Sequence, residues 1–263
     1  MAAADPAARP ADTAGSAPAG SPSRHPVPVG SDAPIFGVMA SMRAMRRLRP
    51  DPVPEELLRQ LIEAAHWAPT GGHLQGYSFV VVTDRAQMAR LATIWQAVAA
   101  LYVPTFAQRP DDMDPAAYRR VIESIEYQAS HFAETPALIV ACYDLGAYPA
   151  EARKRLLRSP GAVRRFGSRR FLALLRHSWA FADRSEAASI YPAVQNLLLA
   201  ARSLGLAANL TTWHLMAEGE VKRVLGIPRA VHTFALIPVG WPAGTFGPVR
   251  RHPIDPMIHR DRW

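Results

Sequence analysis

One apolar run in the middle of the chain, Ala137–Tyr143, constrains the fold more than any other feature. It has the sequence Ala-Leu-Ile-Val-Ala-Cys-Tyr and contains no charged side chain. A strand of this kind has no polar face to present to water, so it is predicted to be central in a sheet and buried on both faces. The other predicted strands are Phe79–Thr83, about Ala207–Thr212, and Thr233–Val239.

Capping residues and apolar spacing predict several helices. The strongest prediction is Ser189–Leu204, where apolar residues recur at helical spacing and Gly205 is placed as a C-terminal cap. A second amphipathic helix is predicted from Pro54, a residue suited to the first helical position. Asp84 is expected to cap a third helix, from about residue 85 to residue 95.

Two regions fit this pattern less well. Residues 1–33 consist mainly of Ala, Pro, Gly, Ser and Asp, which cannot offset the entropy of ordering, so they are predicted to be a flexible, disordered tail. Residues 102–184 contain a Pro-Asp-Asp-Met-Asp-Pro stretch and a basic run. They are interpreted as an irregular insertion, either a lid over a site or a pair of solvated surface helices. The folded domain is predicted to span residues 34–263.

The charge balance limits the possible partners. The 263-residue chain has a formal net charge of +8, and lysine occurs only at Lys154 and Lys222, so nearly all the basic residues are arginine. They are spread along the chain rather than gathered in a tail, which favours an anionic small ligand over nucleic acid. No apolar stretch is long enough for a membrane span and no secretory signal is recognisable, so a cytoplasmic protein without membrane contact is expected.

Common signatures of catalysis by protein side chains are missing from the sequence. Cys142 is the only cysteine, and its apolar neighbours indicate a core residue rather than a nucleophile. The sequence has no P-loop, HExxH, GxSxG or CxxC motif, and no GxGxxG follows the first predicted strand. An enzyme with this sequence is expected to depend on a cofactor for its chemistry. No catalytic side chain and no metal site is assigned.

Two short stretches about twenty residues apart are suited to a phosphorylated, planar cofactor. The first is an arginine cluster at residues 42–48, predicted to end a short helix that starts at Pro34. Guanidinium groups are permanently charged and match phosphate oxygens. The second is the polar loop at residues 68–75, whose adjacent glycines let backbone N–H groups approach such a ligand closely.

The order of these motifs resembles the nitroreductase family. The arginine cluster is followed by Pro-Asp-Pro-Val-Pro, an amphipathic helix ending in Glu-Ala-Ala-His-Trp-Ala-Pro, the loop Thr-Gly-Gly-His-Leu-Gln and a valine-rich strand. Residues 192–206 and the segment from Gly247 to Trp263 continue the match, which covers about residues 36–263. The resemblance implies an α+β fold in which helices wrap a central, mostly antiparallel sheet. It also implies an intertwined homodimer with two FMN sites at the subunit interface.

The activity that this resemblance implies is two-step hydride transfer. NADH or NADPH reduces FMN and leaves, and an oxidised acceptor such as a nitroaromatic or a quinone then takes the electrons in the same pocket. Three alternatives stay open. The same fold can serve another flavin reaction, such as dehalogenation or breakdown of the flavin; the protein can bind or store flavin without catalysis; or it can be a basic nucleic-acid binder.

The resemblance assigns FMN contacts to four parts of the chain. Ala44 stands where the family usually has Ser or Thr, and His73 stands where Asn is usual, which introduces a group that can gain charge near neutral pH. The expected FMN contacts are Arg43, Ala44 and Arg46 in the cluster, Pro69, Thr70, Gly71, His73 and Gln75 in the loop, Leu210, Thr211 and Thr212 beside the ring, and Arg250 and Arg251 as a second phosphate clamp. Tyr102, Phe106, Tyr127 and Trp213 are candidates for stacking on an acceptor, although core packing is the commoner role of such aromatic residues.

Overall fold

The computed structural model describes Gly30 and residues 34–146 and 148–263. The predicted flexible tail therefore lies outside the described residues, with the exception of Gly30. The backbone N–H of Gly30 donates to the carbonyl of Ser203 over 2.7 Å. Among the described residues, no helix is both long and apolar enough to cross a membrane.

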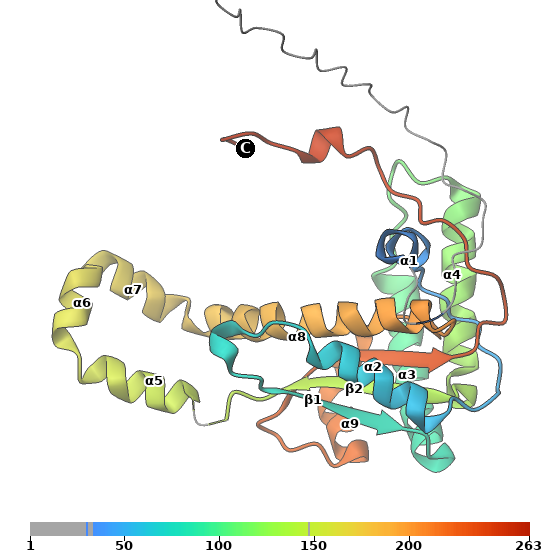
Figure 1. Ribbon diagram of the computed structural model, residues 1–263, viewed down its shortest axis with the longest axis horizontal. Coiled ribbons are helices and arrows are strands. Elements are labelled where there is room, and N and C mark those ends of the chain that lie inside the picture. Colours follow the sequence, from blue (N-terminus) through green and yellow to red (C-terminus); the bar gives the residue numbers. More distant parts are fainter. Residues whose placement is uncertain (1–29, 31–33, 147) are drawn as a thin grey trace, which may run out of the picture.

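One antiparallel sheet forms the centre of the molecule (Figure 1). Its strand order within the described residues is β1-β2-β4-β3. The strands are β1 (Tyr77–Val82), β2 (Ala137–Tyr143), β3 (Ala207–Ala208) and β4 (His232–Gly240). All seven residues of β2 are buried, because this strand lies between β1 and β4 and has a core on each face. The central, doubly buried strand predicted from the sequence is confirmed.

The two cores follow the alternation of side chains along β2. Ala137, Ile139, Ala141 and Tyr143 belong to the core beneath α2 (Glu55–His66) and α8 (Ser178–Ser203). The intervening residues of β2 belong to the core beneath α3 (Arg85–Thr105) and α9 (Glu218–Leu225). Successive side chains of a strand point to opposite faces, so helices cover both faces of this sheet. An α+β fold with a small antiparallel sheet is therefore present.

The predicted strand Ala207–Thr212 is much shorter in the structure. Thr211 and Leu236 exchange two backbone hydrogen bonds of 3.0 and 2.9 Å, but β3 itself ends at Ala208. The next equivalent pair in the ladder would be Asn209 with Pro238, and Pro238 has no N–H to donate. Residues 209–210 therefore leave the sheet.

The predicted helix from Pro34 to Leu48 is wrong in its second half. Helix α1 (Ile35–Ser41) ends before the arginine cluster, and the backbone is extended at Met42. The C-terminal segment takes the backbone bonds that a helix would use: Arg49 donates to the carbonyl of Trp241 over 2.8 Å, and the carbonyl of Arg47 accepts from Ala243 over 3.0 Å. Pairing over a long sequence distance has overridden local helix propensity.

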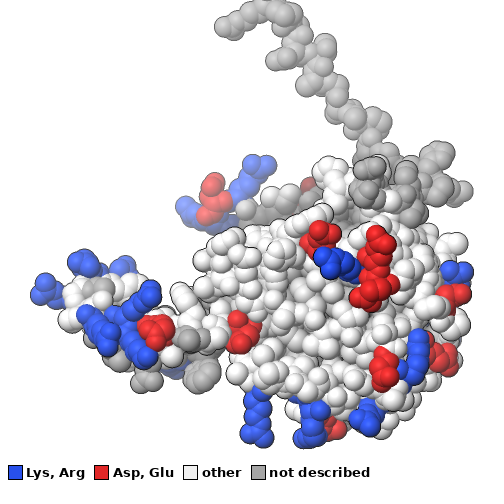
Figure 2. Space-filling model, turned by 60° about the horizontal axis from the view of Figure 1, so that its bottom comes forward, with Lys and Arg blue, Asp and Glu red and all other residues white. Residues whose placement is uncertain are grey.

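The segment predicted as an irregular insertion, residues 102–184, is largely regular. It holds the end of α3, α4 (Pro115–Ser130), which packs on α3, and the central strand β2. It also holds α5 (Tyr148–Leu157), α6 (Pro160–Phe166) and α7 (Ser168–Arg176), and α8 then begins at Ser178 rather than at Ser189. Helices α5 to α7 project from the body as an arm, on which basic side chains gather (Figures 1 and 2). The lid function stays a prediction.

Candidate functional site

A cleft of about 790 Å³ lies between α4, the extended arginine cluster, the chain after β3 and the C-terminal segment. This volume is within the range of small-molecule and cofactor sites. Residues that are far apart in the sequence meet here. The predicted flavin contacts that line the cleft are Arg43, Ala44, Arg46, Leu210, Arg250 and Arg251.

Backbone contacts hold the C-terminal segment against the cleft. The N–H of Val249 donates to the carbonyl of Ala40 over 2.8 Å. Gly247 faces the Arg43 side chain so closely that a Cβ atom there would lie 3.3 Å from Nη1. The imidazole of His252 is 3.5 Å from the carboxylate of Asp112, just before α4. Arg250 and Arg251 on this segment therefore line the same cleft as α4.

Helix α4 supplies one wall of the cleft, and the sequence interpretation missed it. Ala117, Arg120, Val121 and Ser124 line the cleft, and this spacing places them on one face of a helix. The signal was in the sequence: the Asp114 carboxylate accepts from the N–H of Ala117 over 2.8 Å, and a proline follows at the first helical position.

Arg46 is the most informative residue of the site. It is partly buried and lines the cleft as well as two adjoining smaller cavities. Burial lowers the pKa of its guanidinium, and no ion pair or hydrogen bond involves it within the described residues. A buried charge without a partner is costly, so this position calls for an anionic or strongly accepting ligand.

Two neighbouring arginines have structural partners instead. The guanidinium of Arg47 lies 4.1 Å from the centre of the Tyr127 ring. Arg202, on α8, donates from Nε to the hydroxyl of Ser41 over 3.0 Å and stacks 4.1 Å from the Phe246 ring. Cation–π contacts of this kind occupy both side chains, and neither residue lines the cleft.

The predicted loop lies elsewhere in the same chain. The N–H of Gly71 donates to the Ser189 hydroxyl of α8 over 3.1 Å, and Thr70 Oγ1 accepts from the N–H of Gln75 over 3.1 Å. His73 and Gln75 have positive φ angles of 56° and 48°. Such angles strain residues other than glycine and cluster at functional sites. Both side chains are exposed, with His73 Nε2 2.8 Å from Gln75 Nε2.

Helix α8 separates the loop from the cleft. Ser189 contacts the loop, whereas Leu198 lines the cleft. Nine residues of α-helix correspond to about 13 Å along the axis and about half a turn around it. The structure therefore does not bring Pro69, Thr70, Gly71, His73 and Gln75 to the other predicted flavin residues within one chain.

The segment after β3 lines a second, smaller cavity. Leu210, Thr211 and Thr212 line this space of about 140 Å³ together with Arg46 and Gln128. The N–H of Thr211 is bonded to the carbonyl of Leu236 and is therefore not available to a ligand. Gln128, which the sequence interpretation also missed, is buried on α4 and donates from Nε2 to the buried Asn209 Oδ1 over 3.0 Å.

The aromatic candidates pack mainly on one another. Trp213 is stacked between Trp95 and Tyr102, with ring centres 5.3 and 4.0 Å away. Phe106 contacts Tyr102 in turn. Stacking on one another accounts for these positions at the edge of the core, since Tyr102 and Trp213 are partly buried and Phe106 is exposed, and Trp213 also lines the smaller cavity.

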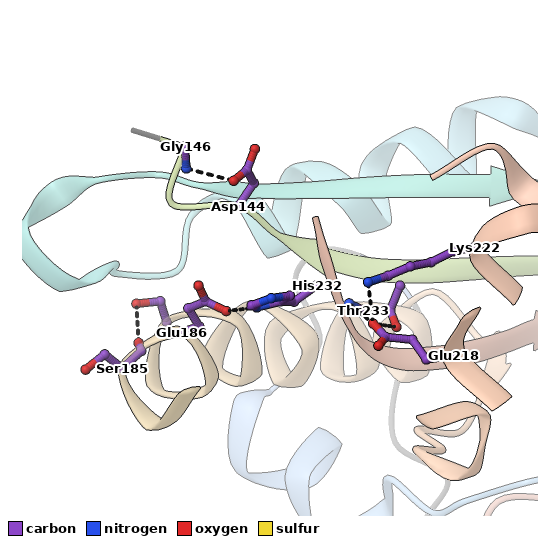
Figure 3. Close-up of polar contacts among 9 residues, drawn as sticks. Asp144, Gly146, Ser185, Glu186, Glu218, Lys222, His232 and Thr233 are labelled. Atoms are coloured by element: carbon purple, nitrogen blue, oxygen red, sulfur yellow. Dashed lines mark hydrogen bonds and ion pairs between the residues drawn. The ribbon is translucent and has the colours of Figure 1, made fainter. Parts of the chain in front are cut away.

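A partly buried polar cluster near the start of β4 has a structural role. The Glu218 carboxylate accepts from the N–H and hydroxyl of Thr233, and lies 2.9 Å from Lys222 Nζ (Figure 3). Burial lowers the pKa of His214 to about 4, and its Nε2 contacts the Thr233 hydroxyl over 3.1 Å. Burial also raises the pKa of Cys142 to about 11. None of these residues lines the cleft.

Comparison with known proteins agrees with this geometry. The sequence profile of the nitroreductase family matches residues 39–241. A protein of Thermus thermophilus named NADH dehydrogenase is 28% identical over 226 residues, which cover 82% of this chain and 90% of that protein. The chain belongs to the nitroreductase family, and the predicted enzyme class, a flavin oxidoreductase, is confirmed.

Solved structures show the same fold. A nitroreductase of Desulfitobacterium hafniense with bound FMN superposes with a TM-score of 0.56 at 20% identity, covering 86% of this chain and 98% of that chain. An iodotyrosine deiodinase bound to FMN and 3-iodo-L-tyrosine superposes with a TM-score of 0.58 at 16% identity, covering 87% of this chain and 99% of that chain.

Proposed function

We propose that this protein is an FMN-dependent NAD(P)H oxidoreductase that works as a homodimer. In this proposal each flavin lies in the cleft of one chain and against the loop of the other. The observation that carries the proposal is Arg46, a partly buried cation that has no partner within the described residues and lines a cleft together with other arginines. The residues present fit FMN, because a phosphate and an electron-rich ring edge supply the acceptors that these guanidinium groups lack.

The two separate groups of predicted residues support the dimer. The strained loop presents His73 and Gln75 outward, on the side of α8 away from the cleft. A second copy related by twofold symmetry places its own loop at the first chain's cleft and receives the same contact in return. Both groups then contribute to each site, as the family resemblance implies.

Each part of the chain has a defined task in this proposal. Bound FMN supplies hydride acceptance and hydride donation. Arg46 stabilises the negative charge that reduction places at the pyrimidine edge of the ring, and Arg43 with the C-terminal arginines holds the phosphate. An N–H beside Thr211 donates to the ring. Water supplies the protons, so no acidic or basic side chain is required.

The visible spectrum of the purified protein tests the proposal. FMN is added, excess is removed, and NADPH and then NADH is added without oxygen. Flavin bands that bleach, followed by reoxidation with a quinone or a nitroaromatic compound, support the oxidoreductase. Protein that stays colourless after reconstitution contradicts it. Bands that neither donor bleaches indicate flavin storage instead.

One second candidate has a specific observation in its favour. The fold superposes over most of its length on iodotyrosine deiodinase, and the arm of α5 to α7 stands free of the body in a single chain (Figure 1). An arm that closes over a bound aromatic substrate suits reductive dehalogenation in the same site. Halide release from halogenated phenols by the reduced protein, without turnover of quinones, would favour this reaction.

A further inference from the structure

The cleft holds more positive charge than one FMN requires. Five arginines line it: Arg43, Arg46, Arg120, Arg250 and Arg251. No aspartate or glutamate lines it in the described part of the chain. None of the five forms an ion pair with another described residue, and the one bond from Arg251 goes to the carbonyl of Arg250. A cleft lined by charges of one sign concentrates ions of the opposite sign, so this cleft is suited to anions.

The charges can be counted against the expected occupant. A phosphate monoester carries about two negative charges at neutral pH, and reduction of the flavin adds about one more at the ring edge. Five guanidinium groups leave a surplus of about two positive charges. A surplus of this size is enough to bind a further phosphate group.

Arg120 is the arginine that the flavin assignment leaves unused. It lies on α4, in the stripe formed by Ala117, Val121 and Ser124, and faces the cleft. The adjacent Arg119 is also exposed but does not line the cleft, because one residue turns a helix by about 100°. The imidazole of His252 lies 3.5 Å from the carboxylate of Asp112, so the residues just before α4 lie close to the C-terminal arginines.

We infer that Arg120 forms a second anion site in the cleft and binds the 2′-phosphate of NADPH. This inference rests on the proposed function and makes it more specific: the electron donor is NADPH rather than NADH. Arg120 acts through binding and takes no part in the hydride transfer. The fork-shaped guanidinium suits a phosphate monoester, which has three oxygens to accept bonds.

Nucleotide fragments that cannot donate hydride test the inference. Titration calorimetry on the FMN-loaded protein compares 2′,5′-ADP, which carries the 2′-phosphate, with 5′-AMP, which lacks it. We expect the native protein to bind 2′,5′-ADP at least about tenfold more tightly, as a charge-assisted contact implies. Arg120→Gln should remove most of this difference, Arg120→Lys should restore part of it, and the matched control Arg119→Gln should leave it unchanged.

Two results would overturn the inference. The first is equal affinity of the native protein for the two nucleotides. The second is an Arg120→Gln variant that binds FMN more weakly but still distinguishes the nucleotides, which would assign Arg120 to the flavin phosphate. The titration is repeated without FMN. Protein that takes up no FMN but still distinguishes the nucleotides through Arg120 contradicts the proposed function and leaves the second anion site standing.

Discussion

At the scale of single residues, Arg46 and Arg47 are adjacent in the sequence but differ in their surroundings: Arg46 lines the cleft, whereas the guanidinium of Arg47 lies against the Tyr127 ring. A cluster of arginines predicts an anion site whatever path the backbone takes, because the charge is permanent. Arg43 and Arg46 do line the cleft. The sequence shows the types of Arg120 and Gln128 but not their positions, because these depend on the packing of α4. Packing also decides which of Arg46 and Arg47 is available to a ligand, because the guanidinium of Arg47 lies against the Tyr127 ring.

Arg46 is expected to lower the stability of the flavin-free protein and to strengthen the binding of FMN. Arg46→Met removes a partly buried, unpaired charge, so the flavin-free variant should be more stable to denaturant than the native protein. Its FMN affinity should fall by about tenfold to a hundredfold, the usual effect of losing a bond to a charged group. Denaturation curves and flavin fluorescence titrations measure the two effects. Arg47→Met is the control, and equal FMN affinities of both variants would count against the assignment.

His214 should make stability depend on pH. Burial lowers its pKa to about 4 in the folded protein, from an ordinary value of 6.5. The unfolded chain therefore binds more protons between these values, and stability decreases as the pH falls through this window. Between pH 7 and pH 5 the loss should be about 2 kcal/mol. The Glu218 carboxylate contributes little above pH 5: burial alone would raise its pKa, but its bonds from Thr233 and Lys222 lower the pKa below its ordinary value of 4.5.

Urea unfolding at several pH values checks this expectation. His214→Asn should flatten the dependence between pH 7 and pH 5. His73→Asn, a change at an exposed loop residue, should retain it. A native-like slope in His214→Asn would show that another group is responsible.

At the scale of elements, the sequence predicted those helices and strands that local features such as caps and apolar stripes determine. The caps and apolar stripes of α2, α3 and α8 were recognisable, as was the buried strand β2. The errors arose where distant parts of the chain pair. Residues 42–48 bond to the C-terminal segment instead of forming a helix, and β3 ends early because Pro238 on the neighbouring strand lacks an N–H. No local pattern in residues 34–48 or 207–212 indicates these partners.

The junction between the loop and β1 should be intolerant of any side chain at Gly76. A Cβ atom at this position would lie 2.3 Å from the carbonyl oxygen of Asp144, which is backbone and cannot move freely. Gly76→Ala should therefore destabilise the protein by about 2 kcal/mol or more. Gly219→Ala, in the open first turn of α9, meets nothing within 4 Å and should raise stability by about 0.5 kcal/mol. Thermal unfolding distinguishes the two, and equal melting temperatures would contradict the expectation.

At the scale of the whole molecule, the family fold was predictable from the order of the sequence motifs. No single motif indicated that the predicted flavin residues of one chain would be divided between a cleft and a separate loop. The structure places the cleft and the loop on different sides of α8. A single chain therefore carries two half-sites, and we expect the dimer to join them. The arm of α5 to α7 and the C-terminal segment both stand away from the body of the single chain (Figure 1).

Complementation between two defective chains tests this central claim most directly. One chain carries Arg43→Ala with Arg46→Ala, and the other carries His73→Ala with Gln75→Ala; each is expected to purify with little FMN. If the site is shared, the coexpressed pair forms mixed dimers with one intact site each. With random pairing about a quarter of all sites should then hold FMN that NADPH bleaches. Coexpressed protein with no more bound flavin than either variant alone would contradict the shared site.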